Sequence, residues 1–311
     1  MDTRTIHARW VTAIWRTVER DAPDRSGSHS HSAIGPTIML KTSAELRSLY
    51  PDQYFYGPEI APEILIFNPL LATFGADVIG DAPALRVPYV VTDPSVGFVP
   101  EGDEIPKSDP TLNEIEVRTG KLATIAEISK ESVQNSPGGS GMLAASQQRA
   151  LAVQANRAFL TNTTAGYSTG INNGVLSAGE VTTNLDAIGD AVTAVEMNGG
   201  NATAIVIDPA GLGRLRVLKE GTTSARNLIQ VDGAGNLSLF GVPVIKSAQM
   251  PARTGLVVDS SDIIAAYGNI ELERSDEAGF TRDTEMFKLK LRLGWKKIHP
   301  ARHSGFTFAA A

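Results

Sequence analysis

FVPEGDEIPKSDPTLNEIEVRTGKLATIAEIS, residues 98–129, decides the fold class of this chain. After a polar segment broken by prolines, Ile115 and Val117 alternate with charged residues, which is the period of a β-strand with one face in water. Just upstream, RVPYVVT (residues 86–92) is rich in the β-branched and aromatic residues of strands. These segments predict a long two-stranded hairpin with a polar tip.

A long helix is predicted after the hairpin. LAASQQRALAVQANRAFL (residues 143–160) follows the turn residues SPGGSG and is rich in strong helix formers. Leu143, Leu151, Ala155 and Phe159 fall near one face of such a helix. We expect it to be the longest helix of the chain.

A second helix is predicted from residue 183 onward, with an apolar face at spacings of three and four made by Leu185, Ile188, Val192 and Val195. Thr183 and Asp186 predict a capping-box-like start, and Gly199 with Gly200 predicts the end.

A strand, a helix and another strand are predicted next. AIVID (residues 204–208) indicates a short buried strand, and Asp208 can cap a helix that has Pro209 at its first position and ends at Gly221. LSLFGVPVIKS (residues 237–247) adds a strand and a turn. Residues 183–221 therefore predict an α/β unit, to which the later segment adds a strand.

The strictest alternation lies near the C-terminus. Apolar residues from Phe287 to Trp295 alternate with cations, which predicts a strand with one apolar and one basic face. The basic residues are Lys288, Lys290, Arg292, Lys296 and Lys297. They could contact nucleic acid, but an acidic stretch lies just upstream (Glu271, Glu273, Asp276, Glu277, Asp283 and Glu285) and the formal net charge is −6. We expect these cations to pair with acidic side chains, in the same subunit or in the next.

The N-terminal part is irregular in pattern. Residues 1–60 predict an extended arm, and closely spaced prolines between Glu59 and Ala84 predict short pieces of helix and loop. Two histidine pairs could be considered for a metal, but neither His29 with His31 nor His299 with His303 has a third ligand in a suitable pattern. We expect no metal site.

Composition excludes several classes of protein. Hydrophobic residues make up 42 % and charged residues 20 % of the 311 residues, as in a folded globular chain. The sequence has no cysteine, which excludes disulfides and thiolate chemistry and fits assembly in a reducing cytoplasm. No apolar run reaches the roughly 20 residues of a membrane-spanning helix, and the start lacks the apolar stretch of a signal peptide. We expect no membrane contact.

No motif of an active site is found in the sequence. GLGRLRVLKEG and DGAGN are rich in glycine but match neither the dinucleotide-binding nor the P-loop pattern, and no G-x-S-x-G segment occurs. We expect no catalytic residue and no cofactor. A soluble α/β hydrolase or binding protein remains an alternative, and it predicts a small oligomer or monomer with a ligand pocket.

The order of these elements resembles the major capsid proteins of tailed bacteriophages of the Hong Kong 97 type, which have an α+β fold. Four stretches also resemble that family in sequence: residues 98–136 its E-loop return, residues 150–176 the end of its spine helix, residues 204–220 with 239–251 its axial domain, and the strands through HPARHSGFTF its closing peripheral-domain strands. The resemblance covers residues 85–308 in the right order.

The resemblance implies five segments. They are an N-terminal arm with a connecting segment (1–84), an E-loop hairpin (85–122), a peripheral domain with the spine helix (123–175), an axial α/β domain (176–265) and returning peripheral-domain strands (266–311).

The resemblance also implies a function: a capsid protein, not an enzyme, that assembles with itself into pentamers and hexamers of an icosahedral head shell. The shell would enclose double-stranded DNA without sequence-specific binding. It would be part of the virion, assembled in the host cytoplasm with a portal protein. A separate scaffolding protein is expected because the region before the core is short, and a decoration protein is compatible. The alternative is an encapsulin-like compartment around enzyme cargo.

Candidate assembly residues come from three places. Glu101, Gly102 and Lys107 match the E-loop stretch of the family, and Gly241, Pro243 and Val244 match its axial-domain motif G-x-P-V. Lys288, Lys290 and Arg292 belong to the basic face of the last long strand.

Overall fold

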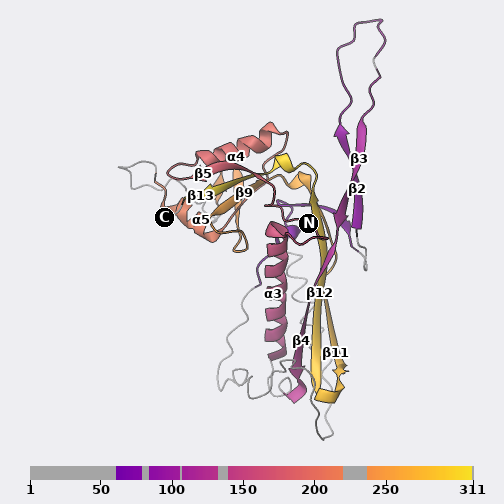
Figure 1. The fold of residues 1–311 in the computed structure, drawn as a ribbon, viewed down its shortest axis with the longest axis vertical. Coiled ribbons are helices and arrows are strands. Elements are labelled where there is room, and N and C mark those ends of the chain that lie inside the picture. Colours follow the sequence, from indigo (N-terminus) through magenta and orange to yellow (C-terminus); the bar gives the residue numbers. More distant parts are fainter. Residues whose placement is uncertain (1–60, 79–83, 106, 132–138, 220–236, 310–311) are drawn as a thin grey trace. The chain divides into compact units, whose positions relative to one another are not determined.

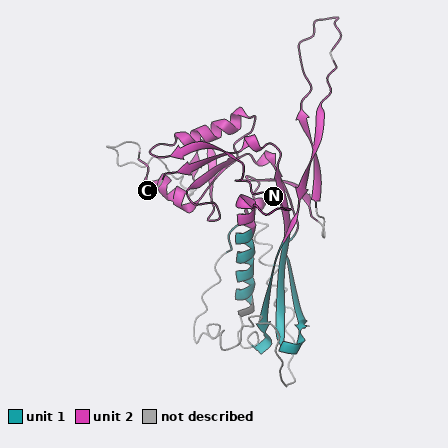
Figure 2. Cartoon of the chain, in the orientation of Figure 1, with its two compact units in different colours: residues 1–63, 122–154, 269–291 teal, residues 64–121, 155–268, 292–311 magenta. Residues whose placement is uncertain are grey.

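The computed structural model describes residues 61–78, 84–105, 107–131, 139–219 and 237–309. The chain separates into two compact units, one of residues 1–63, 122–154 and 269–291 and the other of residues 64–121, 155–268 and 292–311 (Figure 2). The predicted arm, with His29 and His31, lies outside the described residues. The five-part division of the chain is not tested by these units and stays a prediction.

The second unit contains a six-stranded sheet (Figure 1). Its strands, in spatial order, are β5 (Leu176–Val181), β13 (Ser304–Phe308), β9 (Thr254–Val258), β6 (Ala204–Ile207), β8 (Val242–Lys246) and β7 (Ser238–Leu239). All four residues of β6 are buried, which confirms the prediction of a short buried strand at AIVID.

Two helices pack against this sheet, α4 (Asp186–Met197) and α5 (Pro209–Val217). Their apolar side chains join those of the strands in one buried cluster that includes Ile188, Val195, Leu212, Ile205 and Phe306. Ile205 and Ile207 point to one face of β6, and both belong to this cluster together with side chains of α4 and α5. Both helices therefore lie over the same face of the sheet.

The predicted helix starts were right in one case and wrong in the other. Asp208 accepts hydrogen bonds from the backbone N–H of Ala210 and of Gly211, both at 3.0 Å, and Pro209 follows it as predicted. The first residue before α4 is Leu185, whose side chain caps nothing, so the capping box at Thr183 is wrong. Asp186 instead accepts a hydrogen bond from the side chain of Asn184. The helix α5 also ends at Val217, earlier than predicted.

A second sheet has the order β1-β10-β12-β11, with β4 also paired to β12. The strands are β1 (Thr73–Asp77), β10 (Ile263–Tyr267), β12 (Thr284–Lys297), β11 (Glu271–Gly279) and β4 (Gly120–Ser129). The strand β12 confirms the predicted alternation, because Phe287, Leu289 and Leu291 are buried. The strand β1 was missed, since only helix and loop pieces were expected between residues 59 and 84; η2 (Leu65–Phe67) is such a piece.

The long hairpin is confirmed as β2 (Ala84–Thr92) and β3 (Thr111–Arg118), which pair antiparallel from Ala84↔Arg118 onward. The predicted return strand is divided at Thr119, and its second half is β4. The longest helix of the described residues is α3 (Gly139–Thr161), as predicted. Figure 1 shows β2 and β3 side by side, with the loop that joins them extending beyond the ends of both strands.

Candidate assembly surfaces

The distal loop of the hairpin, residues 93–110, holds three of the predicted assembly residues. Glu101, Gly102 and Lys107 are exposed, and no ion pair joins Glu101 or Lys107 to another described residue. Gly102 has φ +94°, a conformation that favours glycine, and the turn around it is closed by the N–H of Asp103 donating to the carbonyl of Pro100 at 3.2 Å. The backbone N–H of Ser95 donates to the hydroxyl of Ser108 at 2.7 Å across the loop.

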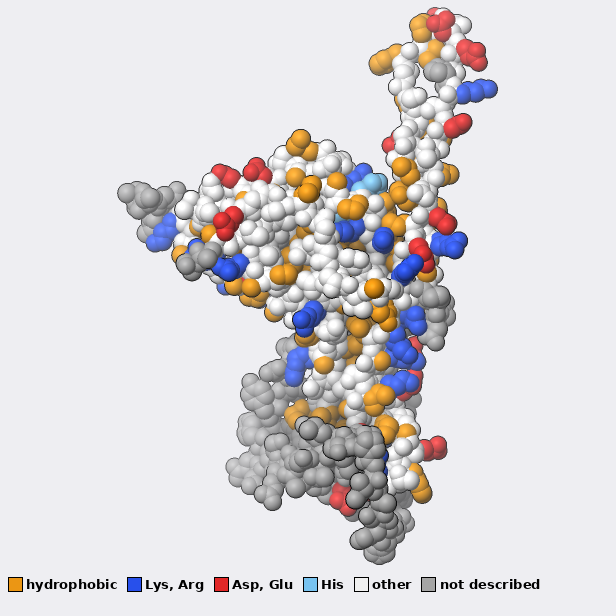
Figure 3. Space-filling view, in the orientation of Figure 1, with side chains coloured by type: hydrophobic (Ala, Val, Ile, Leu, Met, Phe, Trp, Pro, Cys, Tyr) orange, Lys and Arg blue, Asp and Glu red, His pale blue; other side chains and the backbone are white. Residues whose placement is uncertain are grey.

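The same loop exposes large apolar side chains. Val96 is 94 % exposed, Phe98 is fully exposed and Ile105 is also exposed; Leu112, near the start of β3, is exposed as well. Figure 3 shows apolar side chains and acidic ones at the distal end of the hairpin. Several large apolar side chains exposed on one loop mark an interaction site, because burying them removes apolar area from water. The sequence pattern had pointed to the charged residues of the loop and not to Phe98 or Val96.

The axial-domain motif forms the turn and strand at one edge of the six-stranded sheet. Gly241 has φ +79° in the two-residue turn between β7 and β8, and Phe240 beside it has φ +51°. Val244 lies in β8, is half-buried and pairs with Ile205 of β6, while Pro243 pairs with Ser238 of β7. These three predicted residues therefore have structural roles inside the chain.

The basic strand is paired inside the chain. The Nζ of Lys288 lies 2.6 Å from a carboxylate oxygen of Glu273, and the Nζ of Lys290 lies 2.7 Å from Glu271 and 2.8 Å from Glu273. Hydrogen bonds from Lys288 and Lys290 lower the pKa of Glu273 to about 2, and the hydrogen bonds that Lys290 donates to Glu271 and Glu273 raise the pKa of Lys290. The expected pairing of these cations with the acidic stretch is found within one subunit.

The remaining residues of the charged stretch are divided between pairs and exposed positions. Arg292 donates a hydrogen bond to the hydroxyl of Thr119 at 3.2 Å. Glu285 pairs with Arg274 at 2.8 Å, and Asp283 pairs with Lys130 at 3.6 Å. Within the described part of the chain, neither Asp276 nor Glu277 has an ion pair.

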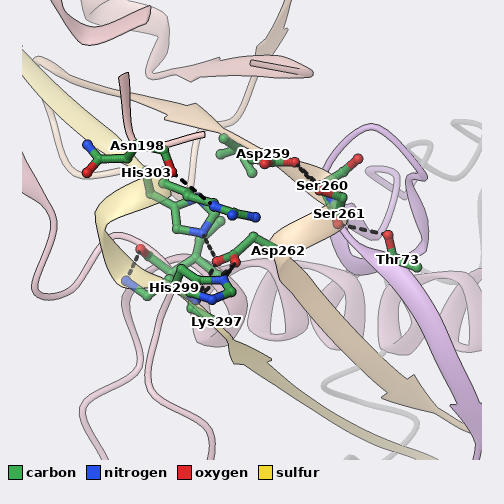
Figure 4. Close-up of polar contacts among 12 residues, drawn as sticks. Thr73, Asn198, Asp259, Ser260, Ser261, Asp262, Lys297, His299 and His303 are labelled. Carbon is green, nitrogen blue, oxygen red and sulfur yellow. Dashed lines mark hydrogen bonds and ion pairs between the residues drawn. The ribbon is translucent and has the colours of Figure 1, made fainter. Parts of the chain in front are cut away.

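A polar cluster around the buried Asp262, missed by sequence reasoning, lies where the two sheets are connected (Figure 4). Asp262 ends η3 (Ser260–Asp262), between β9 and β10, while His299 and His303 flank η5 (Pro300–Arg302), between β12 and β13. One carboxylate oxygen of Asp262 lies 2.7 Å from Nδ1 of His299, and the other lies 2.9 Å from Nε2 of His303. Asp262 therefore links the two segments, η3 and η5, through which the chain passes from one sheet to the other.

Hydrogen bonds stabilise the ionised carboxylate of Asp262. Burial alone would raise the pKa of Asp262, but hydrogen bonds from His303 and from the ring and backbone N–H of His299 bring it below its usual value. An ionised carboxylate only accepts, so Nε2 of His303 carries the proton and its Nδ1 has no partner among the described residues. The Nζ of Lys297 donates to the carbonyls of Ile171 and Asn173, at 2.9 and 2.8 Å, and its burial lowers its pKa.

The side chains of His299 and His303 are both hydrogen-bonded to the carboxylate of Asp262. In the described ranges, no group of three or more histidine, cysteine or acidic residues is arranged to hold a metal ion. No helix of those ranges has the length and apolar character needed to cross a membrane.

Known structures similar to this fold come from phage and related particles. A chain of Gordonia phage Cozz is 18 % identical with a TM-score of 0.64, covering 92 % of this chain and 99 % of that one. A chain of Microbacterium phage Oxtober96 is 15 % identical with a TM-score of 0.67, covering 86 % and 99 %. The capsid of an empty GTA particle, computed with C5 symmetry, is 19 % identical with a TM-score of 0.62, covering 88 % and 100 %. These likenesses establish the α+β capsid fold.

The family follows from the sequence match. No curated protein matches the chain. The model of the phage capsid family, however, matches residues 59–302, which is well over half of the chain and includes the hairpin, the sheet of β1, β10, β12, β11 and β4, and every strand of the six-stranded sheet except β13. The chain therefore belongs to the phage capsid family and is a shell protein of a phage head.

Proposed function

We propose that this chain assembles with itself into rings of five and six that close an icosahedral shell around double-stranded DNA. The observation that carries the proposal is the hairpin. A two-stranded hairpin is marginally stable by itself, and the loop of this one exposes Val96 and Phe98 to water. A neighbouring copy that covers the loop removes this surface from water, and contacts between unlike surfaces of identical subunits close into rings.

DNA, in this proposal, is enclosed without being recognised. The net charge of −6 gives the chain no general attraction for phosphates, and Lys288 and Lys290 are already paired with acidic side chains. We therefore propose that DNA enters through a portal protein under the action of a motor, and that a separate scaffolding protein guides assembly in the host cytoplasm. A shell subunit needs no catalytic site, and we propose none.

The test is electron microscopy of the chain expressed alone and together with its neighbouring genes. Closed icosahedral shells or rings of five and six are expected, with DNA inside particles made by the complete set. Shells filled with an enzyme would favour the compartment alternative, and a chain that stays a monomer even with a scaffold would overturn the proposal.

Replacing both Val96 and Phe98 by serine is expected to abolish shell formation, because the double change removes the apolar surface that the neighbouring copy covers. Particle yield by sedimentation and electron microscopy measures the effect, and the thermal unfolding temperature of the unassembled chain should stay unchanged since both side chains are exposed.

The matched control is Phe98→Leu, which keeps an apolar side chain at the same place and should assemble. Normal shells from the double serine variant would show that the hairpin loop is not an assembly contact.

A further inference from the structure

The two helices over the six-stranded sheet carry opposite charges. The helix α4 has three acidic residues and no cation among its 12 residues, and α5 has two arginines and no acidic residue among its nine. The acidic side chains of α4 (Asp186, Asp190 and Glu196) form no ion pair with the described residues, and neither does Arg216 of α5. Asp186 accepts a hydrogen bond from Asn184, whereas Asp190, Glu196 and Arg216 are exposed and have no ion pair within the described part of the subunit.

The β11–β12 ribbon behaves differently. There Lys288 and Lys290 pair with Glu273 and Glu271 across the two strands at 2.6 to 2.8 Å. The chain can therefore place opposite charges in contact where they stabilise its own fold. The unpaired charges on α4 and α5 point to a partner outside the subunit.

Each helix also ends in an exposed apolar residue beside its charge. Met197, the last residue of α4, is 83 % exposed and follows Glu196, and Val217, the last residue of α5, is 70 % exposed and follows Arg216. We call Glu196 with Met197 the acidic patch and Arg216 with Val217 the basic patch. Met and Arg are enriched at protein–protein contacts, and the two patches are complementary in charge.

We propose that the acidic patch of one copy docks on the basic patch of the next copy around a ring. Two different surfaces meet, so the contact is heterologous and repeats from subunit to subunit until the ring closes. Met197 and Val217 remove apolar area from water at the contact, and Glu196 and Arg216 set which surfaces meet. The inference rests on the proposed function and names the surfaces that join the subunits within a ring.

Charge reversal tests the contact. Glu196→Arg and Arg216→Glu, each alone, should lower the yield of rings and shells at least about tenfold, because each places like charges opposite one another. The double variant restores an opposite pair at every contact, and its yield should return to within about threefold of the wild type. Thermal unfolding of each unassembled variant checks that the fold is kept.

Asp190→Arg is the matched control, since it makes the same change of charge on the same helix outside the patch. Asp190→Arg should assemble with a yield close to that of the wild type, and combining it with Arg216→Glu should not restore the yield that Arg216→Glu loses. If either reversed chain does not fold, Glu196→Gln and Arg216→Gln give the same test: each should lower the yield, and the pair should lower it no further than one of them.

The outcomes separate this inference from the proposed function. Wild-type chains that never assemble would overturn the proposed function. Wild-type shells together with normal assembly of the folded single variants, or with no recovery in the folded double variant, would overturn the docking of the two patches alone.

Discussion

Replacing Asp262 by alanine is expected to lower the free energy of unfolding by about 3–5 kcal/mol, because the change removes a buried carboxylate and leaves several hydrogen-bond donors without their acceptor. The side chains of Asp262 and His303 are each 1 % exposed, so water cannot replace the lost carboxylate. The ring N–H of His303 and the backbone N–H of His299 would lose their acceptor. Urea unfolding of the purified chain measures the loss.

An exposed acidic residue gives the control. Asp190→Ala on α4 removes a carboxylate that has no ion pair in the described ranges, and it should change the free energy of unfolding by no more than about 0.5 kcal/mol. Equal effects at both positions would show that the Asp262 cluster contributes nothing particular.

The Asp262 cluster also predicts a dependence on pH. The pKa of Asp262 is lowered in the folded chain from 3.8, so its contribution to stability is complete above that pH and is lost as the pH falls through the lower folded value. The difference in unfolding free energy between the wild type and Asp262→Asn should therefore be constant at neutral pH and shrink below pH 3.8. Denaturant unfolding from pH 7 down to about pH 3 measures it. A difference that stays constant to the lowest pH would contradict the charged state of Asp262.

Elements with a strong local period could be predicted from the sequence. The alternation through Ile115 and Val117 gave the hairpin, and the alternation from Phe287 to Trp295 gave β12. The strand β1 has no such period, because Gly75 stands in a five-residue segment. A Cβ at Gly75 would lie 2.6 Å from a side-chain carbon of Ile264, so the tight packing of β1 against β10 requires glycine at this position. Glycine is uncommon in strands, and its presence here is the reason that the sequence did not predict β1.

Sites built from distant residues could not be predicted. Asp262 is 37 residues from His299 and 41 from His303, and no local pattern connects an acidic residue at a strand junction to two later histidines. Pairing between the basic and acidic stretches could be predicted from opposite charges in neighbouring segments. The particular pairs needed the register of β11 and β12, which places Glu271 opposite Lys290 and Glu273 opposite Lys288.

Replacing Gly170 by alanine is expected to destabilise the chain by about 3 kcal/mol or more, because a Cβ there would lie 2.5 Å from the backbone N of Asn162 and 2.7 Å from the carbonyl oxygen of Leu160. Gly170 belongs to the turn that folds back on the end of α3, where its N–H donates to the carbonyl of Asn162 at 2.8 Å. Backbone atoms cannot move aside as a flexible side chain can, so the turn must shift and lose the hydrogen bonds that satisfy the last carbonyls of the helix.

Gly213→Ala in α5 is the matched control: a Cβ there meets nothing within 4 Å, and the change should raise the unfolding free energy by about 0.5–1 kcal/mol. Similar stability of the two alanine variants in urea would contradict the close approach at the end of α3.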